Sequence, residues 1–163
     1  MAIHSASPAT SSPGSTGEAL WIATRAGVYG NAPLLVAIAF GLDPSATALL
    51  VPAIAFLTGF VFACLGILIA GIVKTFDNVN YVISAAITPM FLVAGTFFPV
   101  DGLPGWAADL AQVNPLYHCV ELVRHAVFGA LGSVDLIHVA VLLAYATLLW
   151  GLAVRRMTRV LID

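Results

Sequence analysis

Three side chains that could bind a metal ion or a proton lie close together in the sequence: His118, Glu121 and His125. Their spacings of three and four residues place them on one face of a helix. Two interpretations are open, a metal site and an ion pair that joins Glu121 to Arg124 or His125. We favour the ion pair, because the spacing is not that of an H-E-x-x-H zinc motif and Cys119 points to another side of the helix.

Two catalytic chemistries find little support. Ser84 and His138 could act as nucleophile and base only if they met, but we expect them near opposite ends of two apolar helices. Gly66, Gly71 and Lys74 superficially suggest a phosphate-binding loop. The lysine is displaced from its place in G-x-x-x-x-G-K-[ST], and the glycines lie inside an apolar segment. We therefore expect no enzyme activity and no nucleotide-binding site in this chain.

The composition is that of an integral membrane protein. Hydrophobic residues make up 61% of the chain and charged residues only 9%, whereas soluble domains carry about 25% charged residues. The mean hydropathy is +1.03. The net charge of -2 gives no case for a nucleic-acid partner. Two cysteines, Cys64 and Cys119, are too few to indicate a disulfide framework or a metal cluster.

Four apolar segments predict an all-α fold with about four transmembrane helices, because about 20 apolar residues cross a bilayer. The predicted spans are residues 20–42, 46–73, 81–100 and 136–154. The first is the weakest, since Arg25, Asn31 and Pro33 interrupt it. Pro89 is expected to bend the third.

A polar segment rich in Pro and Gly, residues 101–132, separates the last two spans. It contains Asn114-Pro115 and then Glu121 and Arg124, an acid and a base. A simple membrane anchor needs no such excursion. A transporter or channel does, because charges and irregular backbone persist near a bilayer only where protein or a water-filled cavity covers them. Its aromatic residues and those before it fit an interfacial belt better than a surface that stacks sugar or lipid: Phe97, Phe98, Trp106 and Tyr117.

The distribution of basic residues predicts the orientation of the spans. With four spans, all but one of the basic residues considered fall on one side, which the positive-inside rule assigns to the cytoplasm: Arg25, Lys74, Arg155, Arg156 and Arg159. Arg124 falls on the other side. Both termini are therefore expected in the cytoplasm, and residues 101–135 outside.

Small residues recur at helical spacing along the second span: Ala55, Gly59, Ala63, Gly66 and Ala70. Such a stripe allows close contact between helices, within the chain or between subunits. Ala and Gly are also common in membrane helices, so both interpretations stay open.

One pattern resembles a known family. Residues 89–104, PMFLVAGTFFPVDGLP, are followed by Asn114-Pro-Leu and by Glu121, Arg124 and Gly129. This combination resembles the membrane subunit of ABC-2 type transporters, and is most similar to the branch of permeases related to nodulation-factor (lipo-oligosaccharide) exporters. Residues 17–26, GEALWIATRA, resemble the entry to the third span of that family. The motif residues that the resemblance singles out are Gly95, Phe98, Pro99, Pro104, Asn114, Pro115, Glu121 and Arg124.

The resemblance implies a permease of six spans that dimerises in the inner (plasma) membrane and docks separate ATPase subunits. ATP bound there, and not in this chain, would drive export of an amphipathic molecule such as a lipo-oligosaccharide, a polysaccharide or a drug. It also implies short re-entrant helices on the outer side, in residues 101–132.

The expected organisation is a disordered polar tail, residues 1–17, followed by the C-terminal part of the transmembrane domain, residues 18–163. Family members carry two further spans before the motif at Gly17. A truncated, non-transporting scaffold or regulatory remnant of a permease is therefore the alternative function.

Overall fold

The computed structural model describes residues 13–72, 76–96, 102 and 104–160, and throughout this part of the chain the regular structure is helical. The prediction of an all-α fold is confirmed. The helices are α1 (Pro13–Tyr29), α2 (Ala32–Ala39), the 3-10 helix η1 (Ala46–Leu50), α3 (Val51–Ile72), α4 (Phe76–Leu92), α5 (Gly105–Val113), α6 (Pro115–Phe128) and α7 (Asp135–Val160).

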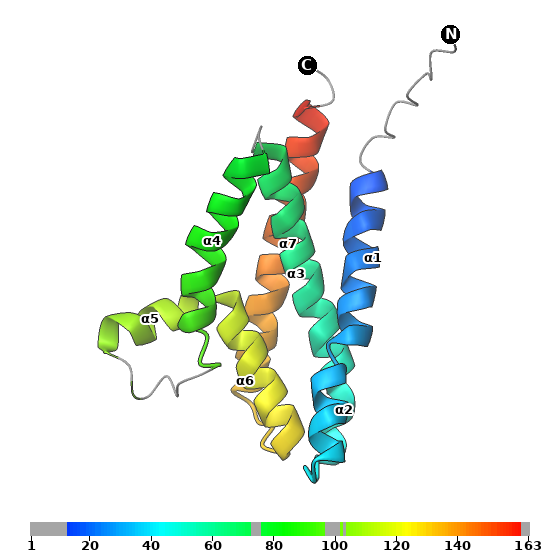
Figure 1. Cartoon of the computed structure of the whole chain (residues 1–163), viewed down its shortest axis with the longest axis vertical. Helices are drawn as coiled ribbons and strands as arrows, with labels where there is room; N and C mark the ends of the chain where they lie inside the picture. The colour runs from blue at the N-terminus through cyan, green and yellow to red at the C-terminus, as the bar shows by residue number, and fades with distance from the viewer. Residues whose placement is uncertain (1–12, 73–75, 97–101, 103, 161–163) are drawn as a thin grey trace.

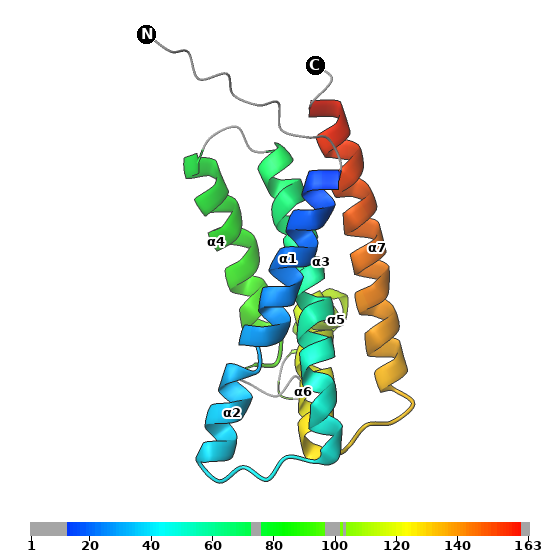
Figure 2. The ribbon, with the colours of Figure 1, turned by 90° about the vertical axis from the view of Figure 1, so that its right-hand side faces the viewer.

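The bundle is built around α3. Helix α1 packs along one side of it and α7 along another, and α6 fills the space between α3 and α7 near their first turns (Figure 1). Helix α4 stands apart from α1 and α7 and contacts the rest sparsely (Figure 2). The core therefore consists of α1, α3, α6 and α7.

Three helical segments are long and apolar enough to cross a membrane: Thr16–Ala39, Ala46–Gly71 and Asp135–Arg156. They correspond to the first, second and fourth predicted spans. In the predicted third span, α4 ends at Leu92, and a turn with Gly95 at φ +76° follows. The predicted limit at residue 100 lies outside the described residues, so a count of four spans stays a prediction.

The first span differs from its predicted form. It is split into α1 and α2, because the chain turns at Gly30 and Asn31 and Pro33 starts the new helix. The Asn31 side chain donates to the Gly27 carbonyl across this break. Helix α1 begins at Pro13, inside the segment predicted as a disordered tail, whose residues 1–12 lie outside the described part.

Arg25 consequently lies well inside the first candidate span, and not near its start as predicted. Its guanidinium carbon is 5.9 Å from the centre of the Tyr29 ring, one turn further along α1, and the residue is exposed. A charge in such a position counts as a functional candidate in a membrane protein.

The small residues of α3 make a close contact with α1. A side chain at Gly59 would collide with Ala26, and the Cα atom of Ala23 lies 3.3 Å from the same point. Further along, Ala63 belongs to one buried cluster with Ala19. Gly66 is exposed and takes no part in this contact, because no neighbouring helix in the described part of the chain comes within 4 Å of a Cβ atom placed there. Among the described residues no helix packs against Gly66, and its predicted role in packing between subunits stays a prediction.

Candidate functional site: the helical hairpin before the last helix

Helices α5 and α6 form a hairpin whose apex is Asn114. Helix α5 lies across the long axis of the bundle, and α6 runs along it to the end at which α3 and α7 begin (Figure 1). Pro115 occupies the first turn of α6, where its missing N–H costs nothing. Gly129 ends the helix at φ +73°, a conformation that favours glycine. The local sequence Asn-Pro…Gly therefore sets both ends of α6.

Asn114 joins two helices at the apex. Its Oδ1 accepts a hydrogen bond from the Leu116 backbone N–H at 3.0 Å, which caps the N-terminus of α6. Its Nδ2 donates to the Met90 carbonyl oxygen, 2.6 Å away in the last turn of α4. Since Asn114 is buried, its amide satisfies groups at both helix ends that water cannot reach.

Arg124 connects the other face of α6 with the turn after α4 through a hydrogen bond. Its Nη1 donates to Glu121 Oε1 at 2.5 Å, and its Nη2 donates to the Gly95 carbonyl oxygen at 3.0 Å. The Glu121 side chain is 13% exposed and that of Arg124 is 41% exposed. The pair lies at the edge of the protein core, so its strength falls between that of a buried pair and a surface pair.

Two histidines of α6 face α7. His118 Nδ1 lies 2.6 Å from His138 Nδ1, and His118 Nε2 lies 2.8 Å from the Gln112 carbonyl oxygen. Two turns later, His125 Nδ1 lies 2.7 Å from Asp135 Oδ1. His118, His138 and Asp135 are buried.

Sequence reasoning missed the partners of both histidines. The sequence suggests only Ser84 as a partner for His138, and Ser84 is exposed on α4. The partners lie ten and twenty residues away along the chain. No local pattern indicates such a contact, since it depends on how the turn at 129–134 brings α7 back onto α6.

The three side chains weighed as metal ligands do not converge. His118 turns toward α7 and Gln112, whereas Glu121 pairs with Arg124 and lies 3.6 Å from His125 Nε2. Among the described residues, no group of three or more His, Cys, Asp or Glu could hold a metal ion. The structure shows the ion pair that we favoured.

The remaining motif residues have simpler positions. Pro104 is exposed directly before α5 and supplies the carbonyl that Ala107 and Ala108 bond. Phe97, Phe98 and Pro99 lie outside the described residues. Trp106 is exposed, while the Tyr117 ring meets the rings of His118 and His138 edge-on, at 5.4 and 5.9 Å. Tyr117 is thus a packing partner of the histidines more than a member of an outer belt.

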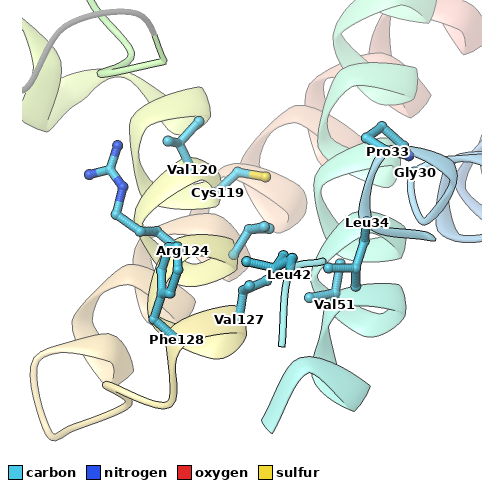
Figure 3. A pocket seen from close by; sticks show the side chains of 11 residues that line it. Gly30, Pro33, Leu34, Leu42, Val51, Cys119, Val120, Arg124, Val127 and Phe128 are labelled. Carbon is cyan, nitrogen blue, oxygen red and sulfur yellow. The ribbon is translucent and has the colours of Figure 1, made fainter. Parts of the chain in front are cut away.

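A cavity of about 440 Å³ separates α6 from α2 and the first turn of α3 (Figure 3). Its walls are almost wholly apolar, with Leu34 and Leu42 on one side and Val120 and Val127 on the other. The Arg124 side chain points away from Leu34 and Leu42 (Figure 3). The arrangement can therefore accept an apolar group without a charge at its centre.

Comparison with known proteins agrees with this architecture. Residues 9–128, which include α1 to α6, match the family described as ABC-2 type transporter. The chain belongs to the ABC-2 type transporter family. It is 31% identical over 147 residues to nodulation protein J of Sinorhizobium fredii (strain NBRC 101917 / NGR234), a match covering 90% of this chain and 56% of that protein.

Two further relatives place the chain in the same group. Nodulation protein J of Bradyrhizobium diazoefficiens is 32% identical over 133 residues, which cover 81% of this chain and 50% of that protein. The inner membrane transport permease YadH of Escherichia coli (strain K12) is 27% identical over 104 residues, 61% of this chain and 40% of that one. The chain spans about half the length of the curated relatives it matches. No solved structure gave a significant match.

Proposed function

We propose that this ABC-2 family chain is part of the membrane-spanning permease of an ATP-driven exporter. The permease would form the path for an amphipathic molecule such as a lipo-oligosaccharide, a polysaccharide or a drug. ATP would be bound by a separate ATPase subunit, and two permease copies would pair. The observation that carries this proposal is the polar hairpin α5–α6, held between apolar helices by Asn114 and Arg124.

The charged and polar side chains along the helices support the assignment as a translocation path in preference to a simple membrane anchor. His118 and Glu121 lie on α6 and Asp135 begins α7, and specific hydrogen bonds hold all three side chains in position. Arg25 is exposed in the middle of a candidate span, where a lipid surface would disfavour it. Another polypeptide or a water-filled passage would provide the polar surroundings that it needs.

The ends of the bundle differ in charge, which supports an inner-membrane topology with both termini in the cytoplasm. Arg155 and Arg156 lie near the end of α7, and the Arg156 Nε atom is 3.4 Å from the Gly71 carbonyl oxygen at the end of α3. Asp43 and Asp135 lie at the opposite end, before α3 and at the start of α7. Basic flanks favour the cytoplasmic side.

Side-specific cysteine labelling tests this topology. In a background without Cys64 and Cys119, Asp43→Cys and Asp109→Cys should react with a membrane-impermeant maleimide added to intact cells. Arg155→Cys should react only after the membrane is opened. Reaction of Asp109→Cys only after opening would contradict the proposed orientation of the hairpin.

Energy coupling is tested with the partner. The DNA beside the gene should encode an ATPase with a Walker motif, and that ATPase should co-purify with the permease. The chain purified alone should bind no ATP, because its glycines lie in a membrane helix and not in a phosphate-binding loop. Saturable ATP binding to the isolated chain would contradict the proposal that only the separate ATPase subunit binds ATP. Failure of any ATPase to co-purify would favour the scaffold alternative.

A further inference from the structure

The two contacts between α6 and α7 respond to protons in opposite ways. His118 meets His138 near the apex of the hairpin, and His125 meets Asp135 near the turn between the helices. A histidine beside a carboxylate is held more strongly when it is protonated. Two histidines that share a hydrogen bond cannot both be fully protonated and remain in contact.

The geometry of the histidine pair fixes how many protons it can hold. The Gln112 carbonyl oxygen can only accept, so His118 Nε2, 2.8 Å away, carries a hydrogen. The two Nδ1 atoms are 2.6 Å apart, so one donates and the other accepts a single shared proton. One additional proton leaves this bond intact as an imidazolium–imidazole pair. A second would place hydrogens on both Nδ1 atoms and two positive charges in a buried site.

The neighbouring groups do not remove this limit. On α6, Glu121 is already paired with Arg124, and His125 Nε2 lies 3.6 Å from the other Glu121 carboxylate oxygen. On α7, Asp135 is bonded to His125 and to the Gly132 backbone N–H. Helix α3 and η1 carry no charged residue, the nearby residues 84–96 of α4 and its following turn carry none, and α5 faces His118 with the Gln112 carbonyl.

We propose that His118 and His138 form a proton-operated latch between the hairpin and α7. The latch is closed with no more than one added proton, and it opens when both imidazoles are charged. The His125–Asp135 contact persists, so α6 swings from α7 at the apex and stays attached near the turn. Opening must also break the hydrogen bond from the Tyr145 hydroxyl to the Val113 carbonyl, 2.5 Å long, which ties α7 to the end of α5.

The pH range follows from the chemistry of histidine. An exposed imidazole titrates at about pH 6.5. The open state binds more protons than the closed state, so opening is favoured as pH falls. The ratio of open to closed protein should rise by up to about tenfold per pH unit for each additional proton bound. Opening is therefore expected on the acid side of neutrality.

The state of the pair can be observed directly in the unaltered full chain. With ¹⁵N-labelled histidine in lipid nanodiscs, the two Nδ1 atoms should show scalar coupling through their shared hydrogen at pH 7.5. At pH 5 the coupling should vanish and both rings should give imidazolium shifts. Coupling that persists at pH 5, or that is absent at pH 7.5, would overturn the proposal.

Spin-label distances test the movement itself. In a background without Cys64 and Cys119, labels at Leu110 and Leu143 report on the apex, and labels at Phe128 and Leu136 report on the turn; all four residues are exposed. From pH 7.5 to pH 5, the apex distance should lengthen and the turn distance should stay the same. Equal lengthening at both positions, or none at the apex, would contradict a latch with this hinge.

Variants assign the response to the pair. His118→Gln and His138→Gln each remove one imidazole of the pair, and the acid-induced lengthening at the apex should be lost in both. The matched control is His125→Gln, which removes a histidine from the same face of α6 but should leave the lengthening in place. Acid opening that survives both changes in the pair would overturn the assignment, and the nanodisc spectra decide the case if these variants fold poorly.

Discussion

Arg124 donates a hydrogen bond to the Gly95 carbonyl, 3.0 Å away, and thereby connects the face of α6 with the turn that follows α4. The same guanidinium holds Glu121, one helical turn earlier. Gly95 is buried and adopts φ +76°, which presents its carbonyl in a turn that other residues adopt with strain. One side chain thus joins the hairpin to the turn after the preceding helix and neutralises the Glu121 carboxylate.

The first prediction concerns this pair. Arg124→Ala should lower the free energy of unfolding by about 1–3 kcal/mol, because it removes the bond to Gly95 and leaves the largely buried Glu121 carboxylate with only His125 nearby. Glu121→Ala should lower the free energy of unfolding by less, since Arg124 keeps its hydrogen bond to the Gly95 carbonyl and is partly exposed. A double-mutant cycle in detergent should give a coupling of about 0.5–1 kcal/mol.

The control for this cycle is Arg124→Lys, which keeps the charge but cannot reach both partners with one planar group. The free energy of unfolding of Arg124→Lys should lie between those of the wild type and Arg124→Ala. Strictly additive effects near zero would show that solvent screens the pair and that α6 does not dock as described.

Asn114 provides the second prediction. Asn114→Ala should lower the free energy of unfolding by about 2 kcal/mol, because it removes the cap of α6, worth about 1 kcal/mol, and a hydrogen bond to Met90 of similar value. Asn114→Asp separates the two contributions. Asn114→Asp retains the capping oxygen but turns an acceptor toward the Met90 carbonyl. Its free energy of unfolding at neutral pH should therefore be no higher than that of Asn114→Ala. Wild-type stability in Asn114→Asp would show that the Met90 contact contributes nothing.

The third prediction compares two glycines of α3. Gly59→Ala should destabilise the protein by about 1–3 kcal/mol, because the new methyl group would meet Ala26 of α1 and force the helices apart. Gly66→Ala is the matched control, since its α-carbon faces open space, and it should be neutral or stabilising by up to about 1 kcal/mol. Thermal unfolding in detergent measures both. Equal losses at the two positions would indicate a partner packed against Gly66.

The fourth prediction concerns thiol reactivity. Burial raises the pKa of the Cys119 thiol above its usual range, and a hydrogen bond with Thr58 offsets part of this rise. A thiol with a raised pKa has less thiolate at neutral pH, and the thiolate is the reactive form. In a Cys64→Ser background, Cys119 should therefore react slowly with maleimide at pH 7, and its rate should rise as the pH is raised.

The reference for Cys119 is a cysteine on the exposed face of α5, Asp109→Cys in a background without Cys64 and Cys119. It should react rapidly at pH 7 and follow an ordinary thiol titration. Equal rates at pH 7 for Cys119 and this reference would mean that α6 does not pack against α3 in the protein as isolated.

The sequence by itself determined the class of fold, because a long apolar run without charges can only be a membrane helix. It also determined the ends of α6, since Asn114, Pro115 and Gly129 act through their own backbone preferences. The Glu121–Arg124 pair was equally local, as residues three apart on a helix are neighbours. The family pattern lies in the same stretch of chain.

Only the tertiary structure decided what α6 touches. The contacts of His118 with His138 and of His125 with Asp135 depend on the path of the turn before α7, and no periodicity records that path. The same holds for Gly59 and Gly66, which share a stripe on α3 but differ in whether α1 covers them. Arg25 lies further inside its span than the sequence predicts for a related reason, because α1 begins before the apolar residues do. Spacing places residues on a face, whereas the packing of other helices decides what that face meets.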